Sequence, residues 1–202
     1  MKKQNILLAL AALVAFANAA FAGNGPQAPT TLKADVDKST LTWNGKKVTG
    51  EHTGTIKLSN GSLQVEGAKL VGGSFDIDMN SIVCTDITDA EYNGKFIGHM
   101  KSEDFFNTAK FPKSTFKITK VKAKGGQNYD VTGDLTVKGI TKPVSFPVVL
   151  KTDGTQAEAT GKITIDRTKY DIKYNSKTFF ASIGDKAIYD DFTIDFKLVA
   201  AK

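Results

Sequence analysis

The amino-acid sequence predicts an all-β protein, an extended antiparallel β-barrel of about eight strands with one short helix near residues 89–101. Three observations predict this class. Apolar and polar residues alternate with a period of two in one segment after another, as in 129–137 and 192–198, which is typical of antiparallel strands with one solvated face. Turn sequences recur about every ten residues. No long segment has the helical period.

The first 22 residues have the three parts of a cleavable secretory signal peptide. Lys2 and Lys3 precede an apolar run over 6–16, and small residues follow as far as Ala22. The run is too short for a permanent membrane span, and an A-x-A sequence is typical of a cleavage site. A second A-x-A at 17–19 leaves the exact cut open. We therefore expect a periplasmic or secreted protein in which residues 23–202 form a single domain.

Turn-forming residues bound the expected strands in chain order. Asn-Gly is the strongest hairpin sequence of the set, and the others carry glycine at a position that suits a tight turn: Asn60-Gly61, Gly125-Gly126, Lys138-Gly139 and Asp153-Gly154. Between these turns, apolar side chains share one parity in 75–79, 144–150 and 163–165. The sequence therefore predicts consecutive hairpins, the connectivity of a β-sandwich or barrel.

Segment 86–101 is the exception to the strand pattern. Asp89 is suited to cap a helix that begins at Ala90. Four apolar residues then share one helical face through spacings of three and four: Tyr92, Phe96, Ile97 and Met100. We expect this helix to lie over a barrel opening or against its wall, with the adjacent Phe105 and Phe106 closing one side.

The residues on the inward parity favour a barrel with an internal cavity. Large rings dominate this set, but Gly133, Ala157, Ala159 and Gly161 share the parity and leave space. A barrel of about eight strands either fills its interior or holds one small ligand, and the small residues favour the ligand. We predict that twelve residues bind it: Phe75, Ile77, Phe116, Ile118, Tyr129, Val131, Leu135, Phe146, Val148, Ile163, Phe192 and Phe196.

Charge and cysteine content restrict the partners. The formal net charge of +6 comes mostly from lysine, and Arg167 is the only arginine. Because nucleic-acid readers usually rely on arginine, we expect no nucleic-acid partner, but a transient contact with an anionic membrane surface. Arg167 is expected in a structural ion pair at the rim, with a ligand head group as the alternative. Cys84 is the only cysteine, so it is expected to be a buried hydrophobe, with pairing between molecules, and a homodimer, left open.

The sequence contains no complete motif for catalysis or for metal binding. The residues after Asp76 begin like a calcium loop but lack its glycine and its glutamate. His52 and His99 lie far apart, and zinc needs three or four close ligands. Neither a G-x-S-x-G elbow nor a phosphate-binding loop is present. We predict no catalytic residue, metal or cofactor. An enzyme using His52, His99 or Cys84 on a lipid-like substrate, and a barrel with a filled core, are the alternatives.

Three co-linear segments carry a family resemblance: HMKSEDFFNTAKFPKSTFKI at 99–118, YDVTGDLTVKGITKPVSFPV at 129–148 and TIDRTKYDI at 164–172. Through them the chain resembles the YceI-like family of exported proteins. The resemblance implies a lipocalin-like barrel whose apolar cavity binds a polyisoprenoid, an isoprenoid quinone or a fatty-acid-like amphiphile. The front of the chain departs from the pattern, since 43–54 reads W-x-G-K-K-x-x-G-x-H-x-G, with Trp43 and His52 as the distinctive side chains.

These observations predict a non-enzymatic carrier or reservoir for a long apolar molecule. Each methylene removed from water contributes about 0.8 kcal/mol, so a prenyl or acyl chain needs a dry cavity and few polar contacts. Lysines at the rim, or Arg167, are the candidates to meet a polar head group.

Overall fold

The computed structural model describes residues 28–202, and the expected signal peptide lies outside them. The described chain contains one α-helix, α1 (Ala90–Lys101), and two short 3-10 helices, η1 (Arg167–Tyr170) and η2 (Gly184–Lys186). Antiparallel strands form the rest of the framework, which confirms the all-β prediction: β1 (Thr30–Ala34), β2 (Thr40–Lys47), β3 (Gly50–Glu66), β4 (Lys69–Cys84), β5 (Lys113–Gly125), β6 (Asn128–Val137), β7 (Ile140–Thr152), β8 (Gln156–Asp166) and β9 (Ile188–Ala201).

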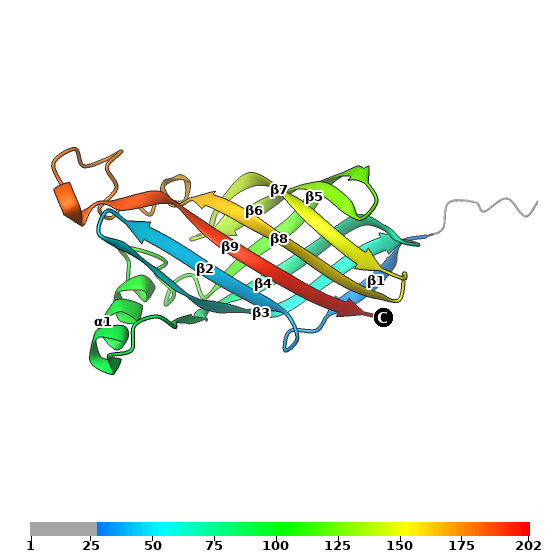
Figure 1. Cartoon of the computed structure of the whole chain (residues 1–202), viewed down its shortest axis with the longest axis horizontal. Helices are drawn as coiled ribbons and strands as arrows, with labels where there is room; N and C mark the ends of the chain where they lie inside the picture. The colour runs from blue at the N-terminus through cyan, green and yellow to red at the C-terminus, as the bar shows by residue number, and fades with distance from the viewer. Residues whose placement is uncertain (1–27) are drawn as a thin grey trace, which may run out of the picture.

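The nine strands occupy the eight positions of a closed barrel (Figure 1). Strands β1 and β2 share one position, because each pairs with β3 on one side and with β9 on the other. The break between them is bonded to β9: the amide of Asp35 donates to the carbonyl of Val199 at 2.8 Å, and the amide of Val199 donates to Ser39 Oγ at 3.0 Å. The prediction of about eight strands is therefore confirmed.

One of the four predicted turns is wrong. Asn60 and Gly61 lie within β3, and that strand turns at Gly67 instead. Gly61 has a packing role, because a Cβ there would stand 2.5 Å from the ring of Phe75. The other three predicted turns connect β5 to β6, β6 to β7 and β7 to β8. The prediction assumed a turn about every ten residues. Strand β3 instead pairs with β4 as far as Glu66, so the Asn-Gly pair lies inside a long strand.

Two of the small residues on the inward parity bring aromatic rings close to the backbone. A Cβ at Gly133 would lie 2.4 Å from the ring of Phe116, and a Cβ at Gly161 would lie 2.6 Å from the ring of Phe196. The rings therefore fill part of the space that the sequence left open. Phe146 stands between them, with ring centroids 5.4 Å from Phe116 and 5.7 Å from Phe196.

We expect Gly133→Ala to lower the free energy of unfolding by about 1–3 kcal/mol, because the methyl group overlaps the Phe116 ring and the carbonyl of Lys117, 2.6 Å away. Urea unfolding measures this change. Gly45→Ala is the matched control, since a Cβ at Gly45, also in a strand, meets no atom within 4 Å. Equal stability of the two variants would contradict the packing role of Gly133.

The two ends of the barrel differ. The end with the turns after β3, β5 and β7 is filled by buried side chains that include Leu32, Val65, Leu150 and Tyr129. The hydroxyl of Tyr129 donates to the carbonyl of Ala68 in the β3–β4 turn, at 3.4 Å. Figure 1 shows α1 and the long β8–β9 connection at the opposite end, away from the C-terminus. Among residues 28–202, no helix has the length and apolarity needed to cross a membrane.

Helix α1 forms where the sequence predicts it. Asp89 is the N-cap, and its carboxylate accepts from the amide of Tyr92 at 2.7 Å. Phe96, Ile97 and Met100 pack on a second buried cluster, made by Trp43, Ile56, Met79, Ile82 and Cys84. Tyr92 shares this face by its spacing but does not pack on the cluster, since it is 51% exposed. Tyr92 lies in the first turn, and only the later turns of α1 reach this cluster.

Candidate ligand-binding cavity

The barrel interior holds an apolar cavity of ≈ 250 Å³. Strands β2 to β9 all contribute to its wall, together with Phe96 and Met100 of α1 and with Phe105 and Phe106. Phe105 is buried and Phe106 half-buried, and the Phe106 ring lies 6.4 Å from that of Phe192. The two phenylalanines after the helix therefore close part of the cavity, as the sequence predicts. The remaining wall consists largely of branched aliphatic and aromatic side chains.

Eleven of the twelve predicted ligand-binding residues line this cavity: Phe75, Ile77, Phe116, Ile118, Val131, Leu135, Phe146, Val148, Ile163, Phe192 and Phe196. Tyr129 does not, because it belongs to the packed end of the barrel. It is buried, as its parity predicts, but it is not a wall residue. Ligand binding by the eleven stays a prediction that their common position makes testable.

Other wall residues were not identified from the sequence. Leu41 and Trp43 line the cavity from β2, and Ile56 and Ile82 line it from β3 and β4. The indole of Trp43 donates to the carbonyl of Val83 at 3.0 Å and stacks near Phe96 with centroids 6.3 Å apart. The alternation of Leu41 and Trp43 with threonine was the signal that could have found them. Both distinctive side chains of the chain's front segment, Trp43 and His52, are wall residues.

Polar side chains in the wall gather mainly at the α1 end of the barrel, which we call the mouth: Lys46, Lys47, His52, Arg167, Tyr189 and Asp191. Lys46 pairs with Glu51 at 3.2 Å, and both side chains are largely exposed. Lys47 has no ion-pair partner within residues 28–202 and is half-buried. The cavity is therefore apolar in its depth and polar at one rim.

Arg167 is a structural residue at this mouth. It is only 4% exposed, and its guanidinium donates to three backbone carbonyls: Tyr189 at 3.1 Å, Ile172 at 2.9 Å and Ile188 at 3.1 Å. The expected ion pair is present with Asp190, at 3.5 Å. Burial lowers the pKa of Arg167, and the carboxylates of Asp190 and Asp166 oppose that shift. Its hydrogen bonds are thus committed to holding the start of β9 against η1.

Asp86 is the centre of a polar cluster beside the mouth. Its carboxylate accepts from the amide of Thr53 at 2.9 Å and from Cys84 Sγ at 3.1 Å, and it lies 2.8 Å from His52 Nδ1. Ligand atoms of His52, Cys84 and Asp86 all lie within 4.8 Å of one another, a spacing from which a metal ion could be held. Sequence reasoning missed this group, because it depends on the register between β3 and β4, which places Cys84 opposite Gly54.

The geometry of this cluster bears on the catalytic alternative. Cys84 is hydrogen-bonded to a carboxylate and not to His52, and burial, followed by that hydrogen bond, raises the pKa of its thiol. A nucleophilic cysteine needs the opposite shift, toward the thiolate. His99 pairs separately with Asp104, at 2.9 Å. No hydrogen bond therefore joins Cys84 to His52 or to His99, so the three residues of the enzyme hypothesis are not arranged as a nucleophile with its base.

We expect Asp86→Asn to flatten the acid dependence of stability. Burial raises the pKa of Asp86, but hydrogen bonds from Thr53, His52 and Cys84 outweigh it and lower the pKa from 3.8 to about 2. A carboxyl whose folded pKa is depressed stabilises the fold above its unfolded pKa and loses that contribution as pH falls through the folded value. Urea midpoints between about pH 5 and pH 2 should fall less steeply in the variant. Asp104→Asn is the control, and parallel curves for Asp86→Asn and the natural protein would contradict the role of the cluster.

Comparison with known proteins identifies the family by sequence. The model of the YceI-like domain matches residues 32–200. Protein YceI of Shigella sonnei is 35% identical over 120 residues, covering 55% of this chain and 60% of that protein. The UPF0312 protein plu2095 of Photorhabdus laumondii is 38% identical over 112 residues, covering 52% and 53%. The alignments thus span little more than half the length of these curated relatives.

Solved structures show the same fold. Burkholderia cenocepacia BcnA superposes with a TM-score of 0.66 and 27% identity, covering 83% of this chain and 99% of BcnA. A polyisoprenoid binding domain from Saccharophagus degradans superposes with a TM-score of 0.61 and 18% identity, covering 84% and 97%. With the family model matched from the first strand to the last, the chain belongs to the YceI-like domain family.

Proposed function

We propose that the protein is an exported binding protein that holds a long-chain amphiphile in its barrel, as a carrier or reservoir and not as an enzyme. The observation that carries this proposal is the cavity of ≈ 250 Å³ with an apolar interior and with polar residues gathered mainly at one mouth. A polyisoprenoid, an isoprenoid quinone or a fatty acid has the matching division into tail and head. Each buried methylene contributes about 0.8 kcal/mol.

Two further observations support the ligand class and the location. The similar domain of Saccharophagus degradans is described as polyisoprenoid binding. The first 22 residues carry the features of a signal peptide, so we place the protein in the periplasm or outside the cell. The raised pKa of the Cys84 thiol and its bond to Asp86 favour binding over nucleophilic catalysis.

The size of the cavity constrains how a long ligand sits. Pockets for small molecules usually enclose about 300–1,000 Å³, and ≈ 250 Å³ lies just below that range. We therefore expect the apolar end of the chain to enter first, and the head group with the adjacent units to remain at the mouth. Lys47 is the side chain best placed there to meet an anionic head, since Arg167 is already bonded to three carbonyls.

Solvent extraction of the protein from its native host tests the proposal. We expect mass spectrometry of the extract to show one class of long-chain amphiphile in near-stoichiometric amount. Protein unfolded in urea and washed before extraction is the control for lipid that adheres to the surface. An extract with no stoichiometric lipid would contradict the proposal and favour the filled-barrel alternative.

A further inference from the structure

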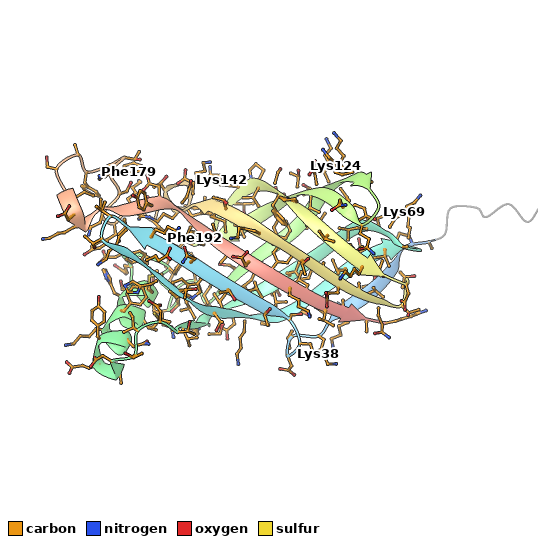
Figure 2. The ribbon with its side chains drawn as sticks, in the orientation of Figure 1. Lys38, Lys69, Lys124, Lys142, Phe179 and Phe192 are labelled. Carbon is orange, nitrogen blue, oxygen red and sulfur yellow. The ribbon has the colours of Figure 1, made fainter. Side chains whose placement is uncertain are left out.

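The connection from η1 to β9 exposes an unusual number of aromatic side chains. Of the five exposed aromatic residues in the described part of the chain, three lie in this connection, Tyr174, Phe179 and Phe180, and a fourth, Tyr189, is the second residue of β9; their exposed fractions run from 37% to 57%. We call residues 171–189 the rim loop. Figure 2 shows Phe179 on this loop, at the barrel end that carries α1. Exposed aromatic residues gathered in one place mark an interaction surface.

Hydrogen bonds hold the backbone of the rim loop in one conformation, and this conformation keeps its aromatic rings exposed. Ser176 is fully buried, and its carbonyl accepts from the amides of Phe179 and Phe180 at 3.1 and 2.9 Å. Thr178 Oγ1 donates to Asp190 at 2.6 Å, on the other side of the same turn. These bonds fix the backbone beneath Phe179 and Phe180, whose side chains are about half exposed.

Three lysines lie in the rim loop with the exposed rings. The ammonium of Lys173 lies 5.1 Å from the centre of the Phe179 ring and also pairs with Asp171 at 2.7 Å. Lys177, Lys186 and Asp185 are exposed and have no ion-pair partner among residues 28–202, so the rim loop carries three lysines against two aspartates, Asp171 and Asp185. Aromatic rings beside lysines suit the boundary of an anionic bilayer, where rings enter the headgroup region and each nearby lysine adds attraction.

The rim loop is continuous with the mouth of the cavity. Within residues 28–202, Tyr189 is the most exposed aromatic residue, and it is also a wall residue of the cavity. The amide of Val48, an exposed residue in the β2–β3 turn, donates to the carbonyl of Ala187 at 3.0 Å. Val48 follows Lys47, which lines the mouth. A flat partner that covers the rings would therefore also cover the entrance.

We propose that the rim loop together with Val48 is a membrane-docking surface that binds an anionic phospholipid bilayer and sets the mouth of the barrel against it. The aromatic side chains enter the interface, and Lys177 and Lys186 contact lipid phosphates. This inference rests on the proposed function, because the docked position would give an amphiphile a short path between the bilayer and the cavity.

Vesicle co-sedimentation of the purified mature protein tests the proposal, with phosphatidylcholine vesicles compared with vesicles that also contain phosphatidylglycerol. We expect binding to the anionic vesicles that weakens as salt increases. The double variant Phe179→Ser/Phe180→Ser should reduce the partition coefficient by about tenfold or more. The double variant Lys177→Gln/Lys186→Gln should reduce it by about tenfold on anionic vesicles only.

A matched control carries Val71→Ser and Val149→Ser, two exposed apolar residues outside the rim loop, and should bind as the natural protein does. Absence of binding to anionic vesicles, or equal binding by the phenylalanine variant, would overturn the proposal. A dimer in solution that dissociates on Phe179→Ser/Phe180→Ser would also overturn it, since a second copy would then be the partner. Solvent extraction of the same variants separates the two hypotheses, because loss of docking leaves the bound amphiphile in place, whereas failure of the proposed function leaves every variant empty.

Discussion

Replacing Arg167 with methionine is expected to lower the free energy of unfolding by about 3–5 kcal/mol. Methionine fills a similar volume but removes every donor. The carbonyls of Ile172, Ile188 and Tyr189 would each lose their guanidinium hydrogen bond, and Asp190 would lose its ion-pair partner. A buried acceptor without a donor costs about 1–3 kcal/mol. The bond to Ile172 is buried and the other two are part-buried, so the three losses together with that of the Asp190 ion pair account for an effect of this size.

Urea unfolding measures the effect of Arg167→Met, and two variants control it. Lys162→Met breaks the ion pair of Lys162 with Asp195, whose two partners are 57% and 53% exposed. It should change the free energy of unfolding by no more than about 1 kcal/mol. Arg167→Lys keeps the charge but should recover only part of the loss, since one ammonium does not reproduce the planar fork of donors. If Arg167→Met proved as stable as Lys162→Met, the guanidinium would not be holding the start of β9.

Replacing Ile163 with tryptophan is expected to weaken binding of a long-chain amphiphile by about tenfold or more. Ile163 projects from β8 into the cavity, opposite Ile194 of β9. The larger side chain takes up part of ≈ 250 Å³. Displacing about two methylenes of ligand is enough for a tenfold effect, at about 0.8 kcal/mol each.

Titration with parinaric acid, a fluorescent long-chain amphiphile, measures the effect of Ile163→Trp. Lys162→Trp is the matched control, because successive residues of a strand point to opposite faces and Lys162 is exposed. The control should bind as the natural protein does, and both variants should keep a cooperative unfolding transition. A folded Ile163→Trp protein with undiminished affinity would place the ligand outside the cavity.

The barrel and most of the cavity wall could be predicted from the sequence because one physical constraint determines both. A strand with one buried face must alternate, and a shift of one residue would turn all of its apolar side chains outward. Parity therefore identified Phe116, Val131, Phe146 and Phe196 as inward-facing, and the structure places all four in the wall. The capped helix was equally local, since Asp89 acts on an amide three residues away.

What could not be predicted depends on distance along the barrel and on register. Alternation places Tyr129 inside but does not say that it lies at the packed end, bonded to the β3–β4 turn. The Asp86 cluster unites residues about 30 positions apart, through pairing of β3 with β4. For Arg167 the sequence predicted an ion pair but not three carbonyls, because Ile172 lies in a connection without regular alternation and Ile188 and Tyr189 precede the alternating residues 192–198.

The shared position of β1 and β2 has a consequence for synthesis. Both strands pair with β9, and Ser39 meets Val199 across 160 positions of sequence. The ring therefore cannot close until β9 is available to pair, and contacts of such long range form slowly. Until then the facing edges of β2 and β8 offer unpaired amides to any neighbouring strand. Until β9 closes the ring, the unfolded and partly folded chain therefore needs protection from aggregation.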